Sequence, residues 1–144
     1  MPRPIAGFTT HLTGEAFAAL RGHTILARMM RDGATDSAAF DQGVTRAGDA
    51  DGLLHHVFGA RSLALTGRMA ESATASYLSG ILIGHEVRSA LGGQRGVVVQ
   101  LIGTPELTAL YARAIAACGC YAERHDGDAA AHGLAAIGAQ AAWN

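Results

Sequence analysis

At 144 residues the chain has the length of a single domain, and residues 1–144 are enough to bury a substantial core. The 11 basic and 12 acidic residues leave a formal net charge of −1, which favours no polyanion as a partner. All the basic residues are arginine. The absence of lysine excludes a lysine Schiff base and a phosphate loop of the GxxxxGK[ST] type within this chain.

Compartment signals are weak but agree with one another. The opening residues MPRPIAGF contain no apolar core of the kind found in a signal peptide. The longest apolar run, residues 77–84, is too short to span a bilayer. Cys118 and Cys120 form a CxC pair rather than a disulfide framework, which is typical of a reducing compartment. We therefore expect a soluble, cytoplasmic protein.

The first half of the chain predicts one short strand followed by helices. The strand is expected over residues 5–11, IAGFTTH, because they are rich in phenylalanine and threonine. Thr13, Thr24, and Thr35 or Asp36 are suited to be the N-cap residues of the next three helices. The residues expected to face inward on the first and third of these helices are Phe17, Leu20, Phe40 and Val44. The residues that share one side of a fourth helix are Leu54, Phe58, Arg61 and Leu65.

The second half predicts the order helix, strand, helix, strand, helix. The longest helix is expected over residues 71–91, and the run VVVQLI at 97–102 has the composition of a buried strand. Residues 120–125 favour a second strand, parallel to the first through a right-handed crossover, and residues 129–142 an alanine-rich helix. We expect a mostly helical α/β domain with a sheet of two to four strands. So small a sheet usually packs against another domain or subunit.

The turn after the strand at 97–102 is the strongest candidate for a ligand contact. Thr104 suits an N-cap and Pro105 the first helical position, where its missing N–H costs nothing. Gly103 permits a tight turn or the close approach of a ligand, and ligands bind at the carboxyl ends of parallel strands. Glu106 places a carboxylate in the first helical turn, so the adenosine end of a nucleotide fits better there than its phosphates. A plain, well-capped turn remains the alternative.

Three small residues lie four positions apart on the long helix: Ser76, Gly80 and Gly84. Such a stripe lets another backbone approach closely. It indicates either tight helix packing or glycines left open beside a ligand. The neighbouring Glu86 would be costly if buried alone, so we expect a solvated or paired carboxylate rather than a catalytic base.

Other catalytic and metal-binding patterns are missing. The seven histidines include no HxxxH or HExxH pair, and the CxC motif has no second pair. Ser79 follows Tyr77-Leu78, so it does not lie in a GxSxG nucleophile elbow. No aromatic and basic interleaving points to nucleic acid. The residues therefore predict no metal site and no catalytic side chain.

Five segments, taken in order, look familiar together. They are FTTHLTGEAFAALRGHTIL, AAFDQGV, LLHHVFGARSLAL, SYLSGILIGHEV and LIGTPELTALYARAI. This series resembles the carboxyl-terminal half of 2-dehydro-3-deoxygalactonokinase, from about Ile5 to the end of the chain. That family phosphorylates a 2-keto-3-deoxy sugar acid with ATP in galactonate catabolism. It is similar to the actin–hexokinase–Hsp70 superfamily, so the resemblance implies a ribonuclease-H-like domain with an actin-like ATPase fold.

The resemblance also implies which residues meet the ligands. The nucleotide-binding element would comprise Gly80, Gly84, Gly103 and Thr104. The block Thr13, Gly14 and Glu15 matches family residues that follow the second phosphate loop, which implies a place along the cleft. In the closing helix, Gly133 would face inward.

The family's amino-terminal half, with a DWGTT-like phosphate loop and a PGTHSKW-like segment, has no counterpart in this chain. The resemblance implies that those parts hold Mg²⁺ and the phosphates of ATP. We therefore expect a chain that is inactive alone and that needs the missing half as its partner. The alternative is a non-catalytic α/β module for oligomerisation or small-ligand binding, favoured by the 49% hydrophobic content.

Overall fold

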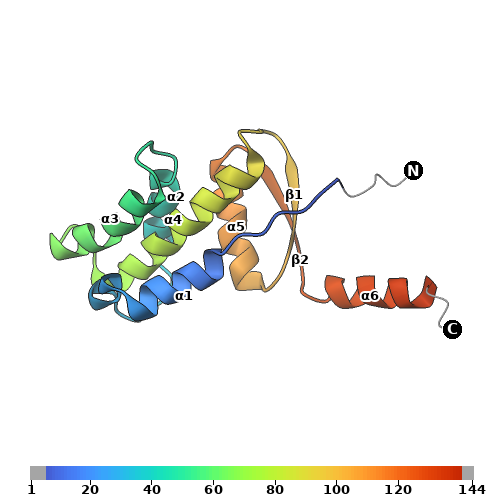
Figure 1. Cartoon of the computed structure of the whole chain (residues 1–144), viewed down its shortest axis with the longest axis horizontal. Helices are drawn as coiled ribbons and strands as arrows, with labels where there is room; N and C mark the ends of the chain where they lie inside the picture. Colours follow the sequence, from blue (N-terminus) through green and yellow to red (C-terminus); the bar gives the residue numbers. More distant parts are fainter. Residues whose placement is uncertain (1–5, 141–144) are drawn as a thin grey trace.

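The computed structural model describes residues 6–140 (Figure 1). Helices α1, α2, α3 and α5 pack around the long helix α4, a two-stranded sheet lies at one end of this bundle, and α6 projects beyond the sheet. In chain order the elements are α1 (Thr13–His23), the short helix η1 (Ile25–Met29), α2 (Ser37–Arg46), α3 (Leu53–Leu65), α4 (Glu71–Leu91), β1 (Val98–Ile102), α5 (Pro105–Ala117), β2 (Tyr121–His125) and α6 (Ala129–Gln140). The mostly helical α/β class is confirmed.

Local capping explains most of the helix starts. The Thr24 hydroxyl accepts from the Leu26 N–H at 3.2 Å, and the Asp36 carboxylate accepts from the Ala39 N–H at 2.9 Å. Both predicted caps are thus confirmed, with Asp36 rather than Thr35 at the start of α2. The prediction for α1 is wrong by one residue, because Leu12 occupies the N-cap position and Thr13 is the first helical residue.

The core lies on both sides of α4. On one side, Leu78 and Ile81 are fully buried among residues of α2 and α3. On the other, Ile83 packs with Phe40 and Val44, which are buried as expected. This second cluster continues to the sheet through the apolar side of α5. α4 therefore joins the helical part of the molecule to β1 and β2.

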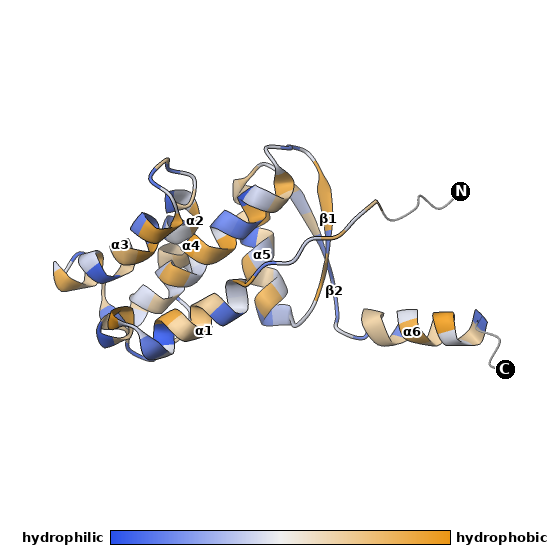
Figure 2. Cartoon of the chain, in the orientation of Figure 1, coloured by the Kyte–Doolittle hydropathy of each residue, from blue (hydrophilic) through white to orange (hydrophobic). Residues whose placement is uncertain are grey.

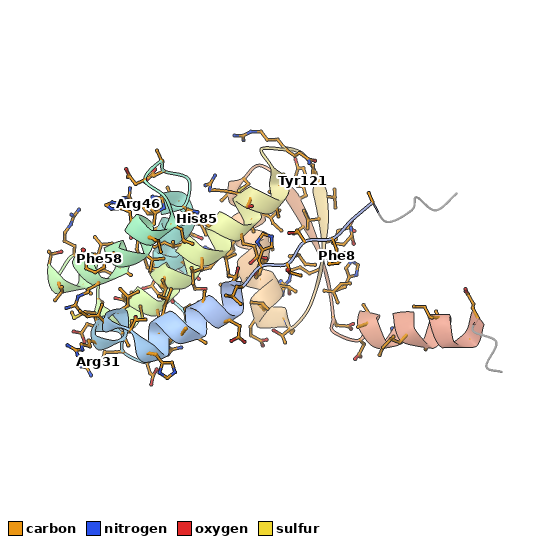
Figure 3. The ribbon with its side chains drawn as sticks, in the orientation of Figure 1. Phe8, Arg31, Arg46, Phe58, His85 and Tyr121 are labelled. Carbon is orange, nitrogen blue, oxygen red and sulfur yellow. The ribbon has the colours of Figure 1, made fainter. Side chains whose placement is uncertain are left out.

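Helix α3 turns its larger apolar residues outward. Its buried residues are His56, Val57, Ala60 and Ala64. Leu54 is 86% exposed and Phe58 is 53% exposed. The side of α3 on which the sequence places these two residues together therefore faces solvent. Phe58 lies at the end of the molecule opposite to the sheet (Figure 3), and Figure 2 shows that hydrophobic residues make up much of α3. The small alanines face α4 because they let the two helices approach closely.

The small-residue stripe of α4 packs against α2. A Cβ added at Gly80 would lie 2.1 Å from the Phe40 carbonyl oxygen, and one at Gly84 would lie 2.7 Å from the Ala47 Cβ. The crossing is tight from both sides, because a Cβ at Gly43 would lie 2.2 Å from the Tyr77 carbonyl oxygen. No side chain fits between these two backbones.

The sheet has one covered face and one open face. β1 and β2 are parallel, as predicted, and their register runs from Val98 opposite Tyr121 to Ile102 opposite His125. Side chains alternate along β1, so Val98 and Ile102 are 51% and 59% exposed while their neighbours face α4 and α5. The expectation of a buried strand is therefore wrong. Tyr121, on the same face of β2, is 66% exposed, so this face of the sheet is open within the described residues.

Both ends of the described chain differ from the prediction. Residues 6–12 form no strand, and Ile5 lies outside the described residues. α6 ends at Gln140, so the last two residues predicted for it also lie outside. No residue of α6 is buried, and a Cβ added at Gly133 would meet no atom within 4 Å. The inward-facing Gly133 implied by the resemblance is thus wrong for this arrangement.

Two observations bear on the expected compartment. Cys118 and Cys120 are both free thiols. Between residues 6 and 140, none of the helices combines the length and the apolar character that crossing a membrane requires.

Candidate functional site

The turn that joins β1 to α5 has the predicted geometry. The Thr104 hydroxyl accepts from the Leu107 N–H at 3.4 Å, and Pro105 is the first helical residue. Gly103 donates its N–H to the His125 carbonyl at 3.4 Å, so the turn is fixed to the end of β2. Thr104 is therefore confirmed as an N-cap. The turn lies at the carboxyl ends of both parallel strands, where α/β folds place their ligands.

Arg124 adds a cation to this turn that was not predicted from the sequence. Its Nε donates to the Thr108 hydroxyl at 3.0 Å, and its Nη2 donates to the Pro105 carbonyl at 2.6 Å. β2 is thereby fastened to the first turn of α5. The available signal was the position of Arg124 near the end of the second predicted strand, because the ends of parallel strands lie side by side.

A polar strip crosses the open face of the sheet beside the turn. The Gln100 side-chain amide donates to the Glu123 carboxylate at 2.6 Å. The His125 Nε2 lies 2.5 Å from the Gln100 amide oxygen, and an amide oxygen can only accept, so this nitrogen carries the proton. Polar groups able to orient a ligand therefore lie on the same edge as Gly103.

Of the three residues predicted to lie along a cleft, Thr13, Gly14 and Glu15, only the first lines a groove. Thr13 lines a groove of about 460 Å³ together with Leu82, His85 and Glu86, all on α4. Gly14 and Glu15 are exposed, and a Cβ at Gly14 would meet no atom within 4 Å. Thr13 is thus the member of the block that the structure places in a groove.

Glu86 is a paired carboxylate, as expected. It accepts a hydrogen bond from the Tyr111 hydroxyl at 2.6 Å, which links α4 to α5. Burial, and after it the bond to Glu86, raise the pKa of Tyr111 well above its usual range, while a bond to Thr13 lowers it. The phenol therefore stays protonated and acts as a donor. These three side chains join α1, α4 and α5.

A histidine pair lies behind the same groove. His56 is fully buried, and its Nδ1 lies 2.9 Å from the Nε2 of His85, which lines the groove. The Nε2 of His56 is buried without a partner. Burial is the main cause that lowers the pKa of both rings, and Arg46 adds to it at His56. The two rings are therefore neutral near pH 7.

The structure does not bring all predicted nucleotide residues together. Gly103 and Thr104 form the turn, whereas the space beside Gly80 and Gly84 is filled by α2. A nucleotide has no access to that space in this arrangement. Of the two interpretations of Gly80 and Gly84, tight helix packing is the one that agrees with the structure. The physical reason is that Gly43 on α2 is as small as its neighbours on α4, which lets the helices meet backbone to backbone.

Within residues 6–140, no three histidine, cysteine, aspartate or glutamate side chains gather in a way that could hold a metal ion. The described part of the chain offers a groove, a capped turn and a polar strip instead.

Replacing Thr104 by alanine is expected to lower the free energy of unfolding by about 0.5–1 kcal/mol, since it removes the hydroxyl that accepts from Leu107. Denaturant unfolding monitored by circular dichroism measures the change. Thr45→Ala is the matched control, because the Thr45 hydroxyl donates to the Asp41 carbonyl inside α2 and caps nothing. Equal losses in the two variants would contradict the capping role.

Known proteins match the chain along nearly its whole length. A family model described as 2-keto-3-deoxy-galactonokinase matches residues 2–137. A Rhizobium meliloti protein named "Probable 2-dehydro-3-deoxygalactonokinase" is 33% identical, over 96% of this chain and 47% of its own length. An Escherichia coli protein named 2-dehydro-3-deoxygalactonokinase is 30% identical, over 88% of this chain and 44% of its own length.

The fold matches as well. A crystal structure from Sinorhizobium meliloti, of a protein provisionally named 2-dehydro-3-deoxygalactonokinase, superposes with a TM-score of 0.80 at 34% identity. The match covers 90% of this chain and 45% of that one, so the chain spans slightly less than half the length of the relatives it matches. The resemblance carried by the five sequence segments is confirmed, and the chain belongs to the 2-keto-3-deoxy-galactonokinase family.

Proposed function

We propose that this chain is the carboxyl-terminal, nucleotide-side domain of an ATP-dependent 2-dehydro-3-deoxygalactonokinase, and that it acts together with the remainder of such a kinase. The observation that carries the proposal is the family match over nearly the whole chain, combined with coverage of less than half of the relatives. The substrate would be a 2-keto-3-deoxy sugar acid, as the relatives' names indicate.

The β1–α5 turn is the proposed contact for the nucleoside. Gly103 leaves room for a ligand, since a Cβ there would meet only the Thr108 methyl at 3.5 Å. Thr104 and Arg124 hold the turn rigid. Glu106 in the first turn of α5 disfavours a phosphate at this helix end. The adenosine end of ATP is therefore the part that this turn is suited to meet.

Mg²⁺ and the phosphates are proposed to be held mainly outside this chain. Phosphoryl transfer depends on positioning and on charge stabilisation around the transferred group. The described residues contain no cluster able to hold a metal ion, and the chain has no lysine. The chain's own contribution would be to bind and orient the nucleoside. The parallel strands with helices packed beside them support a ribonuclease-H-like domain, which we include in the proposal.

Reconstitution tests this function. The part of the Rhizobium meliloti relative that the chain does not match is produced as a separate polypeptide and mixed with this chain. ATP binding is measured by calorimetry, and phosphorylation of 2-keto-3-deoxygalactonate by coupled assay. We expect activity in the mixture and none in either part alone. An inactive mixture, with this chain sedimenting as a stable oligomer, would instead favour the non-catalytic assembly module.

Gly103→Val is expected to weaken ATP binding by about tenfold, because two added methyl groups would occupy the ligand's side of the turn. Gly103→Ala is expected to give a smaller loss and to leave the unfolding midpoint unchanged, given the ordinary 3.5 Å contact. Gly22→Val is the control, because Gly22 lies on α1 with no atom within 4 Å of its added Cβ. Unchanged ATP affinity in Gly103→Val would remove the turn from the site.

A further inference from the structure

Arg88 is a partly buried cation that the described part of the fold leaves without an acidic partner. It lies in the last turn of α4, and its Nη2 donates a long hydrogen bond of 3.4 Å to the Val44 carbonyl of α2. Its Nε is buried without a partner, and its Nη1 forms no hydrogen bond within residues 6–140. The arginines that form an ion pair with a carboxylate are Arg21, Arg31, Arg46 and Arg113. Arg88 therefore keeps a positive charge that no carboxylate offsets.

The loop after α2 packs against the Arg88 guanidinium but does not neutralise it. A Cβ added at Gly48 would lie 2.8 Å from the Arg88 Nη2 and 2.9 Å from its Cζ, so a larger residue at Gly48 would displace the guanidinium. The acidic residues of this loop, Asp49 and Asp51, both contact Arg46 instead, at 2.7 Å and 3.5 Å. The loop thus fixes where the Arg88 charge lies and leaves it unpaired.

Arg95 brings a second free cation to the same place. Arg88 and Arg95 both line a cavity of about 190 Å³ between the end of α4, the loop that follows it and the end of α5. A Cβ added at Gly119 would lie 3.0 Å from the Arg95 Nη1, so this guanidinium lies over the turn between α5 and β2. The Gly96 N–H donates to the Gly119 carbonyl at 2.9 Å, which joins the two connections. Within the described residues Arg95 forms no side-chain hydrogen bond and no ion pair.

The charges around this cavity do not cancel. No aspartate or glutamate lines it. The carboxyl ends of α4 and α5 reach it through Leu91 and Ala117, and each helix end carries roughly half a negative charge. Two such ends offset about one of the two guanidinium charges, so a net charge of about +1 remains. Stabilising the helix ends therefore accounts for one arginine and leaves the other available to a ligand.

A phosphate group has the chemistry that this cavity lacks. It carries a charge of about −1.5 to −2 near pH 7 and offers three acceptor oxygens, which the planar donors of a guanidinium bind well. A single water needs about 15 Å³ of such volume, so 190 Å³ leaves room for the five atoms of the group. Bound there, it would offset the remaining charge and accept from the free Nη1 of Arg88 and from Arg95.

We propose that Arg88 and Arg95 bind the phosphate group of a small anion in this cavity. The cavity lies at the amino ends of β1 and β2, whereas the β1–α5 turn lies at their carboxyl ends (Figure 1). The two places are thus at opposite ends of the sheet. The anion site is separate from the proposed nucleoside contact, and it does not depend on the proposed function.

Binding of inorganic phosphate to the whole chain tests the inference. Titration calorimetry in a low-salt buffer is expected to show saturable binding at one site, with a Kd of about 1 mM or lower. Arg88→Gln and Arg95→Gln each remove one guanidinium and should weaken binding about tenfold. Arg68→Gln is the matched control, because it removes the same charge from the exposed turn after α3. Its loss should stay below about twofold.

A carboxylate placed in the cavity gives a second test that keeps both arginines. Ala117→Glu adds the carboxylate to the lining, whereas Ala116→Glu adds it to the same exposed helix end outside the lining. We expect Ala117→Glu alone to abolish phosphate binding. Phosphate should also raise the urea midpoint of the wild type and of Ala116→Glu, compared with chloride at equal ionic strength. The midpoint of Ala117→Glu should not respond to phosphate.

A further titration distinguishes the two sources of a phosphate group. Glycerol phosphate, a phosphate monoester, is compared with inorganic phosphate on the wild type and on Arg95→Gln. Tighter binding of the ester assigns the cavity to a phosphorylated small molecule, and equal or weaker binding assigns it to the free ion. Both results support the inference, provided that Arg95→Gln weakens them.

Three results would overturn the inference. Phosphate affinity that is unchanged in both Arg88→Gln and Arg95→Gln removes the site. An equal loss in Arg68→Gln shows attraction to the overall charge rather than to this cavity. Acetate that binds as tightly as phosphate contradicts the assignment to a phosphate group. None of these results bears on ATP binding at the β1–α5 turn, so the proposed function stands or falls by its own test.

Discussion

Replacing Gly80 by alanine is expected to destabilise the protein by about 3 kcal/mol, because the added Cβ would lie 2.1 Å from the Phe40 carbonyl oxygen. The obstacle is the backbone of α2 at Phe40 and Val44, which cannot turn aside as a side chain can, so α2 and α4 must move apart and repack. Alanine favours a helix over glycine by about 1 kcal/mol, which offsets only part of this cost. Urea unfolding monitored by circular dichroism measures the difference.

Gly59→Ala is the matched control, with the opposite expected sign. Gly59 lies inside α3, and a Cβ there would make an ordinary contact of 3.8 Å with the Tyr77 hydroxyl. The same substitution should therefore stabilise the protein by about 0.5–1 kcal/mol through helix propensity. A Gly80→Ala variant as stable as the wild type would show that α2 does not pack on α4 as described. It would also reopen the face of α4 at Gly80 and Gly84 to a ligand.

Short-range signals account for what the sequence predicted well. The caps at Thr24, Asp36 and Thr104 each depend on a side chain and an N–H within three residues, so local chemistry suffices to find them. The strand–turn–helix order after Leu91 is local in the same sense. The parallel pairing of β1 and β2 also followed, because a helix between two strands leaves few other topologies.

The predictions failed where the burial of a strand or helix face depends on which other element packs against it. An apolar run such as residues 97–102 has the same composition whether one or both of its faces are covered, and here one face of β1 is open. Phe58 shares one side of α3 with other large residues, but the packed side is the one with small alanines. Gly80 illustrates the same limit at the site, since a small stripe does not reveal which backbone approaches it.

The unpredicted parts of the candidate site are contacts across long sequence separations. Arg124 reaches back to Pro105 and Thr108, and Tyr111 reaches Glu86, through geometry that the fold alone creates. The His56–His85 pair spans two helices and has no motif, because the two histidines lie 29 positions apart in sequence. Each contact lies where α3, α4 or α5 meets another element.

The stability of the protein is expected to fall as the pH drops below about 6.5, through this histidine pair. Burial lowers the pKa of His56 and of His85 in the folded state, so the unfolded chain binds more protons once the pH falls below the ordinary histidine value. The stabilisation is thus fully present above that value and is lost below it. One such proton gives a limiting slope of about 1.4 kcal/mol per pH unit.

The surrounding charges do not reverse this sign. Arg46 and the ring of His55 lower the pKa of His56, while Asp49 and Asp51 raise it by less than burial lowers it. At His85, the neighbouring His56 and Arg88 both act in the same direction as burial. His85 can reach water through the groove, but His56 has no such exit, because it is fully buried. His56 should therefore dominate the acid limb.

The variant His56→Phe isolates the contribution of the His56 ring to the pH dependence of stability. Phenylalanine has a similar shape and no titrating group, and the substitution also removes the buried Nε2 that lacks a partner. We expect urea unfolding between pH 5 and 8 to show that the free energy of unfolding depends less on pH in His56→Phe. The stability of the variant should therefore rise relative to that of the wild type as the pH falls. His132→Gln, on exposed α6, controls for the loss of an imidazole. An acid limb equally steep in His56→Phe would show that the folded chain can take a proton at His56 without opening, which the contact with His85 and the absent partner at Nε2 argue against.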